Sequence, residues 1–200
     1  MANIGTFGDE FPGTSLSGSW TAFNSGSPTV GGGLLALGTE TVPLNGVRTT
    51  STFTWQGSKI RGRFDAAAAG SGTLRATWVG PFLGASSSTT VFAVAGAFGN
   101  QAALYTVSIN GGYVSGPVAS SAANHVWWEW DFTGADMVFR TSADGTSWTD
   151  RHTATGTNGS AYNGANLFVA GSNNSGSSNI DAIIATESAG GRFRPYFITG

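Results

Sequence analysis

Apolar and polar residues alternate with a period of two in many short runs of this chain, and no run keeps a helical period over three turns. Such alternation is typical of strands with one buried and one exposed face. Between Ile60 and Asp65, for example, apolar or small residues alternate with Arg61 and Arg63. About a dozen such runs, separated by turn residues at short spacing, predict an all-β sandwich.

Turn residues and glycines place several of these strands. Asn110-Gly111 between two apolar runs predicts a tight hairpin, because Asn and Gly tolerate the positive φ that such a turn needs. The glycine-led run from Gly31 to Leu37 and the run from Thr41 to Leu44 are predicted to be edge strands. The polar stretch from Gly171 to Asn179 is predicted to be a loop before the last strand.

The densest aromatic stretch lies between His125 and Thr155. Within Val126–Phe132, the even-numbered positions are all apolar and are predicted to face the core, whereas Trp127, Glu129 and Asp131 share the other face. Each buried ring contributes about 150–250 Å² to such a core. A turn at residues 144–145, Asp-Gly, is predicted to return Trp148 to the same core.

Composition excludes several classes of partner. Only 10% of the 200 residues are charged, against about 25% in an average protein, and the formal net charge is −2 without a basic patch, which argues against nucleic acid. Cysteine is absent, so disulfides and thiolate metal sites are excluded. No run approaches the roughly 18 consecutive apolar residues of a membrane span, and the N-terminus lacks the pattern of a secretory signal.

Motifs along nearly the whole chain carry a family resemblance. The segments FGDEFPGTSLSGSWT, GGGLLAL and TFTWQGSKIRGRFDA, the closing NLFVAGSNNSGSSNIDAIIA and, most specifically, His-x-Trp-Trp … Ser-x-Asp-Gly-x-x-Trp resemble the concanavalin A-like lectin/glucanase superfamily. The last pattern is similar to lectin-like domains in tail and other virion proteins of actinobacterial phages. The resemblance implies a two-sheet antiparallel jelly-roll sandwich over residues 1–188, and its motifs imply no catalytic site.

Glucanases of that superfamily carry Glu-x-Asp-x-x-Glu, and a retaining mechanism needs two carboxylates about 5–5.5 Å apart. Glu129 and Asp131 match the first two positions, but the third is Gly134. The sequence therefore predicts a protein that is not an enzyme. The alternative is a hydrolase that combines Glu129 with a carboxylate from elsewhere. Without catalysis, the two acids are expected to pair on the wet face with arginines such as Arg61, Arg63 or Arg140.

No motif for a cofactor or a metal is evident. His125 and His152 have no Glu or Cys at ligand spacing, so no zinc site is predicted. A calcium site would need converging carboxylates, and Asp9, Glu10 and Asp181 would supply them only if the two ends of the domain meet.

Candidate carbohydrate contacts come from aromatic and amide side chains. Trp127 or Trp148 could stack on a sugar instead of lying in the core. The predicted contacts are Trp148, Tyr162, Asn173 and Asn174. The last two lie in the polar stretch, which could also hold an ion or be simply solvated.

A separate tail, residues 189–200, follows Gly190-Gly191 and carries aromatic rings beside two cations. Three rings exposed to water would be unfavourable, so the tail is expected either to fold back on its own sandwich or to dock on another subunit. The predicted assembly contacts are Phe193, Arg194, Tyr196 and Phe197.

Two hypotheses for the function follow. The first is a non-enzymatic virion accessory protein, on a phage tail or capsid, with other virion proteins as partners, a homo-oligomeric state and an additional role in binding a host surface glycan. It requires no cofactor, no nucleic acid and no membrane insertion. The second is a free carbohydrate-binding module or a glycan hydrolase of the same superfamily.

Overall fold

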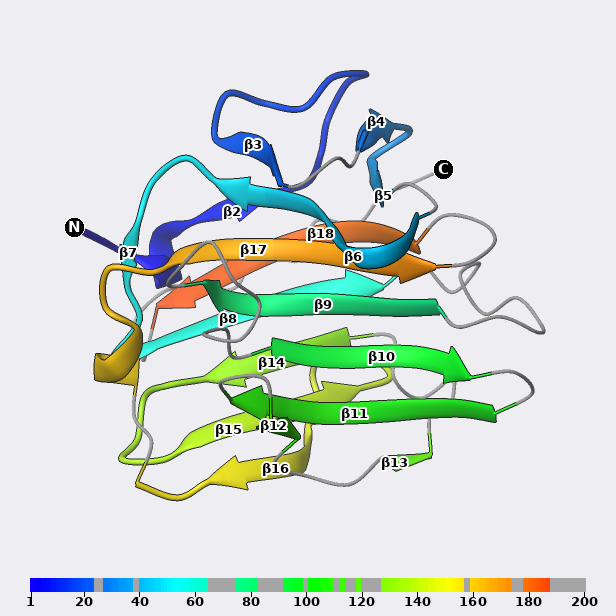
Figure 1. Ribbon diagram of the computed structural model, residues 1–200. Helices are drawn as coiled ribbons and strands as arrows, with labels where there is room; N and C mark the ends of the chain where they lie inside the picture. The colour runs from blue at the N-terminus through cyan, green and yellow to red at the C-terminus, as the bar shows by residue number, and fades with distance from the viewer. Residues whose placement is uncertain are drawn as a thin grey trace.

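The computed structural model describes residues 1–23, 27–37, 40–64, 75–82, 92–98, 101–109, 112–113, 118–119, 127–156, 159–173 and 178–187. Within these ranges the regular structure is almost entirely strand (Figure 1). The two described helices are short 3-10 turns, η1 (Ile4–Thr6) and η4 (Gly159–Tyr162). Neither has the length or the apolar character to cross a bilayer.

One sheet, called here the β9 sheet, lies in front in Figure 1. Its strands are β3 (Trp20–Phe23), β6 (Glu40–Thr49), β9 (Arg75–Phe82), β10 (Phe92–Phe98), β11 (Gln101–Ile109), β12 (Gly112–Tyr113), β13 (Val118–Ala119) and β17 (Asn166–Asn173). They lie in the order β12-β11-β10-β9-β17-β6-β3, and β13 pairs with β11.

The second sheet, called the β14 sheet, lies behind the first. Its strands are β2 (Gly8–Asp9), β4 (Thr29–Gly31), β5 (Leu34–Leu37), β8 (Ser58–Phe64), β14 (Trp127–Asp131), β15 (Met137–Ser142), β16 (Thr149–Ala154) and β18 (Ser178–Glu187). The order is β16-β15-β14-β8-β18-β5-β4, and β2 pairs with β18. A separate parallel pair joins β1 (Ala2–Asn3) to β7 (Phe53–Thr54).

The pairings described within the two sheets are antiparallel, and the chain crosses between the sheets repeatedly. β8 therefore lies between β14 and β18, while β17 lies between β9 and β6, although these strands are far apart in sequence. The predicted all-β, two-sheet antiparallel jelly-roll sandwich is confirmed. The strands that the predicted hairpin joins, β11 and β12, do pair, since Ile109 lies opposite Gly112; residues 110–111 themselves lie outside the described residues.

Two predicted elements differ in the structure. The run from Gly31 to Leu37 is split, because Gly32 and Gly33 adopt positive φ (63° and 79°) and turn β4 into β5 at the sheet edge. The run from Thr41 to Leu44 is the first part of the longer strand β6. The described β3 residues pair with residues 46–49 of β6 and not with 41–44, so the edge position predicted for that run stays a prediction.

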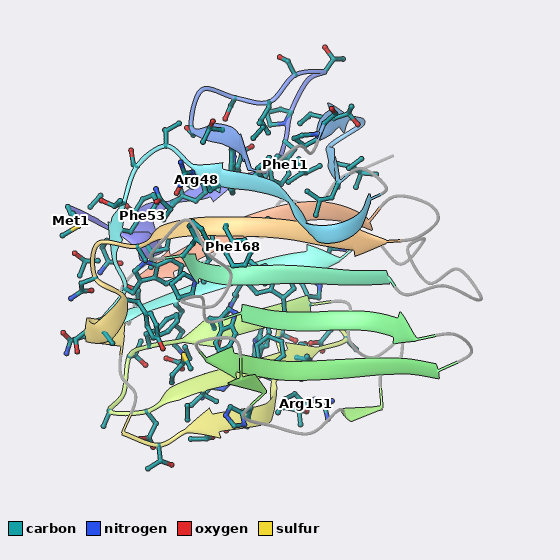
Figure 2. The ribbon with its side chains drawn as sticks, viewed as in Figure 1. Met1, Phe11, Arg48, Phe53, Arg151 and Phe168 are labelled. Carbon is teal, nitrogen blue, oxygen red and sulfur yellow. The ribbon has the colours of Figure 1, made fainter. Side chains whose placement is uncertain are left out.

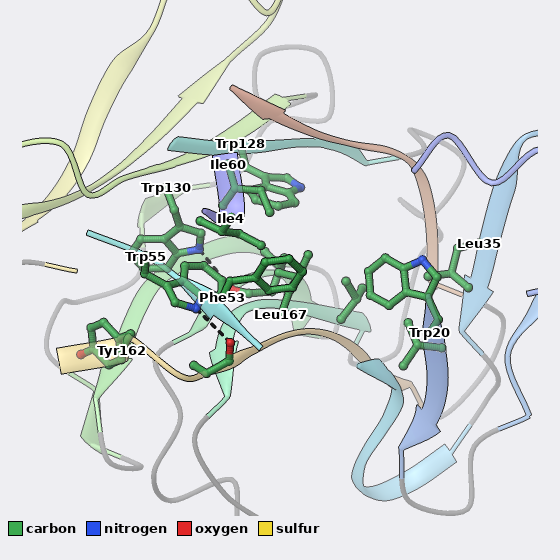
Figure 3. Packing of buried hydrophobic residues seen from close by; sticks show 14 of the residues in the cluster. Ile4, Trp20, Leu35, Phe53, Trp55, Ile60, Trp128, Trp130, Tyr162 and Leu167 are labelled. Carbon is green, nitrogen blue, oxygen red and sulfur yellow. Dashed lines mark hydrogen bonds between the residues drawn. The ribbon is translucent and has the colours of Figure 1, made fainter. Parts of the chain in front are cut away.

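The core fills the space between the sheets and is rich in aromatic side chains. Trp128, Trp130 and Phe132, from β14 and the residue after it, are completely buried, as the alternation along that strand predicts. Figure 3 shows Trp55, Trp130 and Ile60 packed together, with Trp20 and Leu35 in a separate part of the cluster.

Indole hydrogen bonds connect this core to the backbone. Trp130 Nε1 donates to the carbonyl of Val79 on the opposite sheet at 3.1 Å, and Trp55 Nε1 donates to the carbonyl of Ala165 at 3.2 Å (Figure 3). A buried N–H needs such a partner, so the Trp130 bond ties β14 to β9 of the opposite sheet, and the Trp55 bond ties the segment between β7 and β8 to the residue before β17. Outside the main cluster, Phe168 of β17, labelled in Figure 2, packs against Phe82 with ring centroids 5.6 Å apart.

Gly62 of β8 provides the space for Trp128 on the neighbouring strand. The two residues pair directly, and a Cβ built on Gly62 would lie 2.1 Å from Cζ2 of the indole. Because real Cβ atoms do not approach this closely, only glycine lets the ring of Trp128 lie across β8.

We predict that Gly62→Ala destabilises the protein by about 1–3 kcal/mol, the usual cost of overpacking a filled core. Urea unfolding measures the difference. Gly134→Ala is the matched control, because the nearest atom to its added Cβ is 3.8 Å away. Equal stability of the Gly62→Ala variant and the wild type would contradict the packing described here.

Candidate functional site

The outer face of the β14 sheet, the one turned away from the core, carries a concentrated group of charged and aromatic side chains. On β14, Glu129 and Asp131 point away from the core because they alternate with Trp128 and Trp130. They are not on a wet face, however: their side chains are only 1% and 7% exposed. Buried carboxylates of this kind need cations close by.

Register places those cations on the two neighbouring strands. Arg61 of β8 and Arg140 of β15 lie directly opposite Glu129, while Lys59 of β8 lies opposite Asp131. Directly opposed residues of antiparallel strands share a face, so the register alone brings these five side chains together.

Each carboxylate contacts more than one cation. Arg61 Nε and Arg140 Nη1 both donate to Glu129, the latter at 3.0 Å to Oε1. Lys59 Nζ lies 2.7 Å from Oδ2 of Asp131, which also accepts from Arg140 Nη1. The predicted pairing of the two acids with Arg61 and Arg140 is confirmed, and Lys59 is a partner that the prediction missed.

These ion pairs continue to Asp150 on the edge strand β16, and they favour the ionised form of Asp131. Arg140 Nε donates to Asp150 of β16, which raises the pKa of the guanidinium above its usual range despite the opposing effect of burial. Burial alone would raise the pKa of Asp131, but hydrogen bonds from Lys59 and Thr133 outweigh it and lower the pKa to about 2.

The turn between β15 and β16 is organised by Asp144. Its Oδ1 accepts hydrogen bonds from the backbone N–H of Ser147 (2.7 Å) and Thr146 (2.8 Å), which lower the pKa of this carboxyl below its usual range. Gly145 adopts a φ of 74°, and a Cβ there would lie 3.2 Å from Cε2 of Trp127. The Ser-x-Asp-Gly motif thus shapes a turn that packs against one tryptophan and ends at another.

Two arginines of β8 lie against these two indole rings. The guanidinium carbon of Arg61 is 4.7 Å from the ring centroid of Trp148, and that of Arg63 is 5.8 Å from the ring centroid of Trp127. Both distances fall within the range of cation–π attraction. The predicted return of Trp148 to the core was therefore wrong: the ring lies on the outer face, because Arg61 and the network below it attract it there.

We call this set of side chains the charged face. It consists of Lys59, Arg61, Arg63, Trp127, Glu129, Asp131, Arg140, Trp148 and Asp150. Among the tryptophans whose side chains the structure describes, Trp127 and Trp148 are the two that are partly exposed. The signal in the sequence was the i, i+2 spacing of cations on β8 beside the acids on β14, but the pairing of those strands was not predictable locally.

The predicted carbohydrate contacts do not gather at one place. Trp148 lies on the charged face, whereas Tyr162 lies in η4, only 6% exposed, with its ring 6.2 Å from that of Phe132. Burial raises the pKa of Tyr162, and little of its ring remains for a sugar to contact. Asn173 ends β17, so part of the stretch predicted to be a loop is strand, and Asn174 lies outside the described residues.

The N-terminal and C-terminal strands do meet, as a calcium site at Asp9 would require, since Asp9 of β2 pairs with Ile183 of β18. The Asp9 carboxylate instead accepts from Phe11 N–H at 2.7 Å and Trp20 Nε1 at 2.8 Å. Within the described ranges, no group of three or more His, Asp or Glu side chains is placed to hold a metal ion. The predicted assembly contacts, Phe193, Arg194, Tyr196 and Phe197, lie outside those ranges.

The charged face is poorly suited to glycan hydrolysis. A general acid needs a carboxyl that is protonated near neutral pH, whereas Asp131 is ionised down to a pKa of about 2. Both carboxylates are also covered by cations that would have to be displaced before a substrate could reach them. The arrangement can instead present fixed guanidinium groups and indole rings to a ligand.

Comparison with known proteins places the fold. No family model and no curated protein matches the chain. Solved structures similar to it include a xylan β-1,4-xylosidase from Bacillus halodurans (TM-score 0.63, 15% identity, 90% of this chain and 39% of that one). A second is a structure of the endo-acting O-glycanases that human gut microbiota express to initiate mucin breakdown (TM-score 0.59, 12% identity, 91% of this chain and 99% of that one). A third is the exoplasmic/lumenal domain of VIP36 bound to Ca²⁺ and Man3GlcNAc (0.55, 13%, 82% and 82%).

At these identities the likeness shows the fold alone: the chain has the β-sandwich of lectins and glycan hydrolases, as the resemblance to the concanavalin A-like superfamily implies. It spans about two fifths of the xylosidase chain, so that enzyme's activity does not transfer with the fold. The similar structures include glycan hydrolases and a glycan-bound domain, so the fold does not distinguish catalysis from glycan binding.

We predict that Asp131 makes the protein lose stability in acid. Its pKa is lowered in the folded state, so its contribution is present above about pH 4 and is lost as the pH falls towards 2. Between pH 5 and pH 2 the loss from this group is about 2 kcal/mol.

Urea unfolding at both pH values measures it, with Asp131→Asn showing a shallower decline than the wild type. Asp150→Asn, whose carboxylate is 60% exposed, is the control and should keep the wild-type decline. Parallel pH curves for Asp131→Asn and the wild type would rule out the proposed contribution.

Proposed function

We propose that this chain is a non-enzymatic, lectin-like accessory protein of a phage particle, and that it binds a surface glycan on the charged face. The observation that carries the glycan-binding part is the pair of partly exposed indoles, Trp127 and Trp148, each held against an arginine of β8. Flat apolar rings next to oriented hydrogen-bond donors are the combination that pyranose rings contact.

Binding without catalysis is supported by the chemistry of the acids on β14. Glu129 and Asp131 serve as counter-ions for three cations, and the position of a third carboxylate is Gly134. The glycan bound in the VIP36 structure supports the same role for a sandwich of this kind.

The virion role is the finer part of the proposal. It is supported by the similarity of His-x-Trp-Trp … Ser-x-Asp-Gly-x-x-Trp to lectin-like domains of phage virion proteins and by a chain with only 10% charged residues. Residues of this motif stabilise the fold: Trp128 is buried in the core, and Asp144 accepts hydrogen bonds in the turn that leads to Trp148. Phe193, Arg194, Tyr196 and Phe197 are proposed as the contacts with other subunits.

We expect Trp148→Ala to weaken binding of any glycan identified on an array by about tenfold or more, because a stacking surface is removed. Trp148→Phe, which keeps a flat ring, should retain most of the affinity. Calorimetric titration measures both variants. Unchanged affinity in Trp148→Ala would move the binding site away from the charged face.

The same incubations test for catalysis. Chromatography should find the glycan at its original chain length after prolonged incubation. Release of shorter products by the wild type, and their loss in Glu129→Gln, would show that the acids on β14 are catalytic after all.

For the virion role, we expect mass spectrometry of gradient-purified phage particles to detect the protein. A variant with Phe193→Ala and Tyr196→Ala should be depleted from particles while its glycan binding is unchanged. Absence of the wild-type protein from particles would contradict the virion role without affecting the glycan-binding proposal.

A further inference from the structure

We propose that the ligand of the charged face is an anionic saccharide, a chain that carries carboxylate or sulfate groups. This inference rests on the proposed glycan-binding function and deepens it by naming the chemical class of ligand.

The balance of charge on this face differs from that of the whole chain. The chain has nine basic and eleven acidic residues and a formal net charge of −2. Among the residues whose side chains the structure describes, the charged face carries four cations, Lys59, Arg61, Arg63 and Arg140, and three acids, Glu129, Asp131 and Asp150. Its described side chains thus have a formal charge of +1, whereas the chain as a whole is acidic.

The cations of the charged face are more exposed than the two carboxylates of β14. The side chains of Glu129 and Asp131 are nearly buried, whereas those of Arg61, Arg140 and Lys59 are 17%, 22% and 26% exposed. The cations thus stand between the two carboxylates and the solvent. An approaching anion meets the cations first, and the acids below hold them in place instead of repelling the ligand at close range.

Two guanidinium groups of the charged face are held in place by indole rings. Arg61 and Arg63 are two residues apart on β8, so their backbone positions are about 7 Å apart on the same face. Each group lies against an indole, and Arg61 also donates to Glu129, which is buried beneath it. A planar guanidinium held in this way is suited to bidentate binding of a carboxylate or a sulfate.

Ring contact and charge contact lie together at Trp127, because Arg63 of β8 lies against its ring. The exposed acids on this side of the sheet are engaged by donors of the protein. Asp150 is bonded to Arg140, and Asp144, in the turn that packs against Trp127, accepts from the backbone N–H groups of Thr146 and Ser147.

The test compares oligogalacturonate, which carries a carboxylate on every sugar, with its fully methyl-esterified form, which has the same backbone without the charge. Sulfated dextran oligosaccharides and unsulfated dextran oligosaccharides of the same length make the second arm, for sulfate. Calorimetric titration of the whole protein is carried out at about 0.05 and about 0.5 M salt, because screening weakens charge contacts.

We expect at least one anionic chain to bind, its neutral counterpart to bind at least tenfold more weakly, and high salt to weaken the anionic complex at least tenfold. Arg63→Gln should lower the affinity for the anionic chain about tenfold with an unchanged melting temperature. Arg48→Gln, on β6 of the opposite sheet, is the matched control and should leave the affinity unchanged.

Equal, salt-independent affinity for charged and neutral chains would overturn the inference and leave the glycan-binding proposal standing. Equal losses in Arg63→Gln and Arg48→Gln would also overturn it, because the attraction would then be diffuse. If neither the charged chains, their neutral counterparts nor any glycan on an array binds, the proposed function itself fails.

Discussion

Two carboxylates on β14 point away from the core and are nevertheless almost completely buried, and the outer face of that sheet is arranged around neutralising them. Glu129 and Asp131 alternate with the fully buried Trp128 and Trp130, so both sides of the strand are buried from Trp128 to Asp131. An unpaired buried charge would cost several kcal/mol. Lys59, Arg61 and Arg140 are therefore structural requirements of β14, and their residual exposure gives the same face its positive character.

Packing on the inner side and charge on the outer side depend on one register. Gly62 allows the indole of Trp128 to lie across β8, and this contact fixes the pairing that also sets Arg61 opposite Glu129 and Arg63 opposite Trp127. The Asp144 turn then places Trp148 over Arg61. A shift of β14 by one residue would exchange its two faces, so the core and the charged face both depend on the same register.

Much of this could be predicted from the sequence, because alternation is a local signal. The strands and the buried side of β14 followed from it, and the pairing of β11 with β12 followed from Asn110-Gly111. Alternation also placed Glu129 and Asp131 on the face opposite the core, for which Arg61 and Arg140 were among the expected partners. The role of Lys59 and the outward position of Trp148 could not be predicted, because they depend on strands that pair across long separations. Local patterns also suggested that Tyr162 was available to a sugar, although it packs against Phe132.

The most direct measurement of whether the charged face binds the ligand uses the indole N–H signals of the seven tryptophans in an NMR titration with oligogalacturonate. The signals of Trp127 and Trp148 should shift in a saturable way. Those of Trp55 and Trp130, whose N–H groups are bonded to carbonyl oxygens in the core, should stay in place. Saturable binding that leaves the signals of Trp127 and Trp148 unmoved would contradict the account.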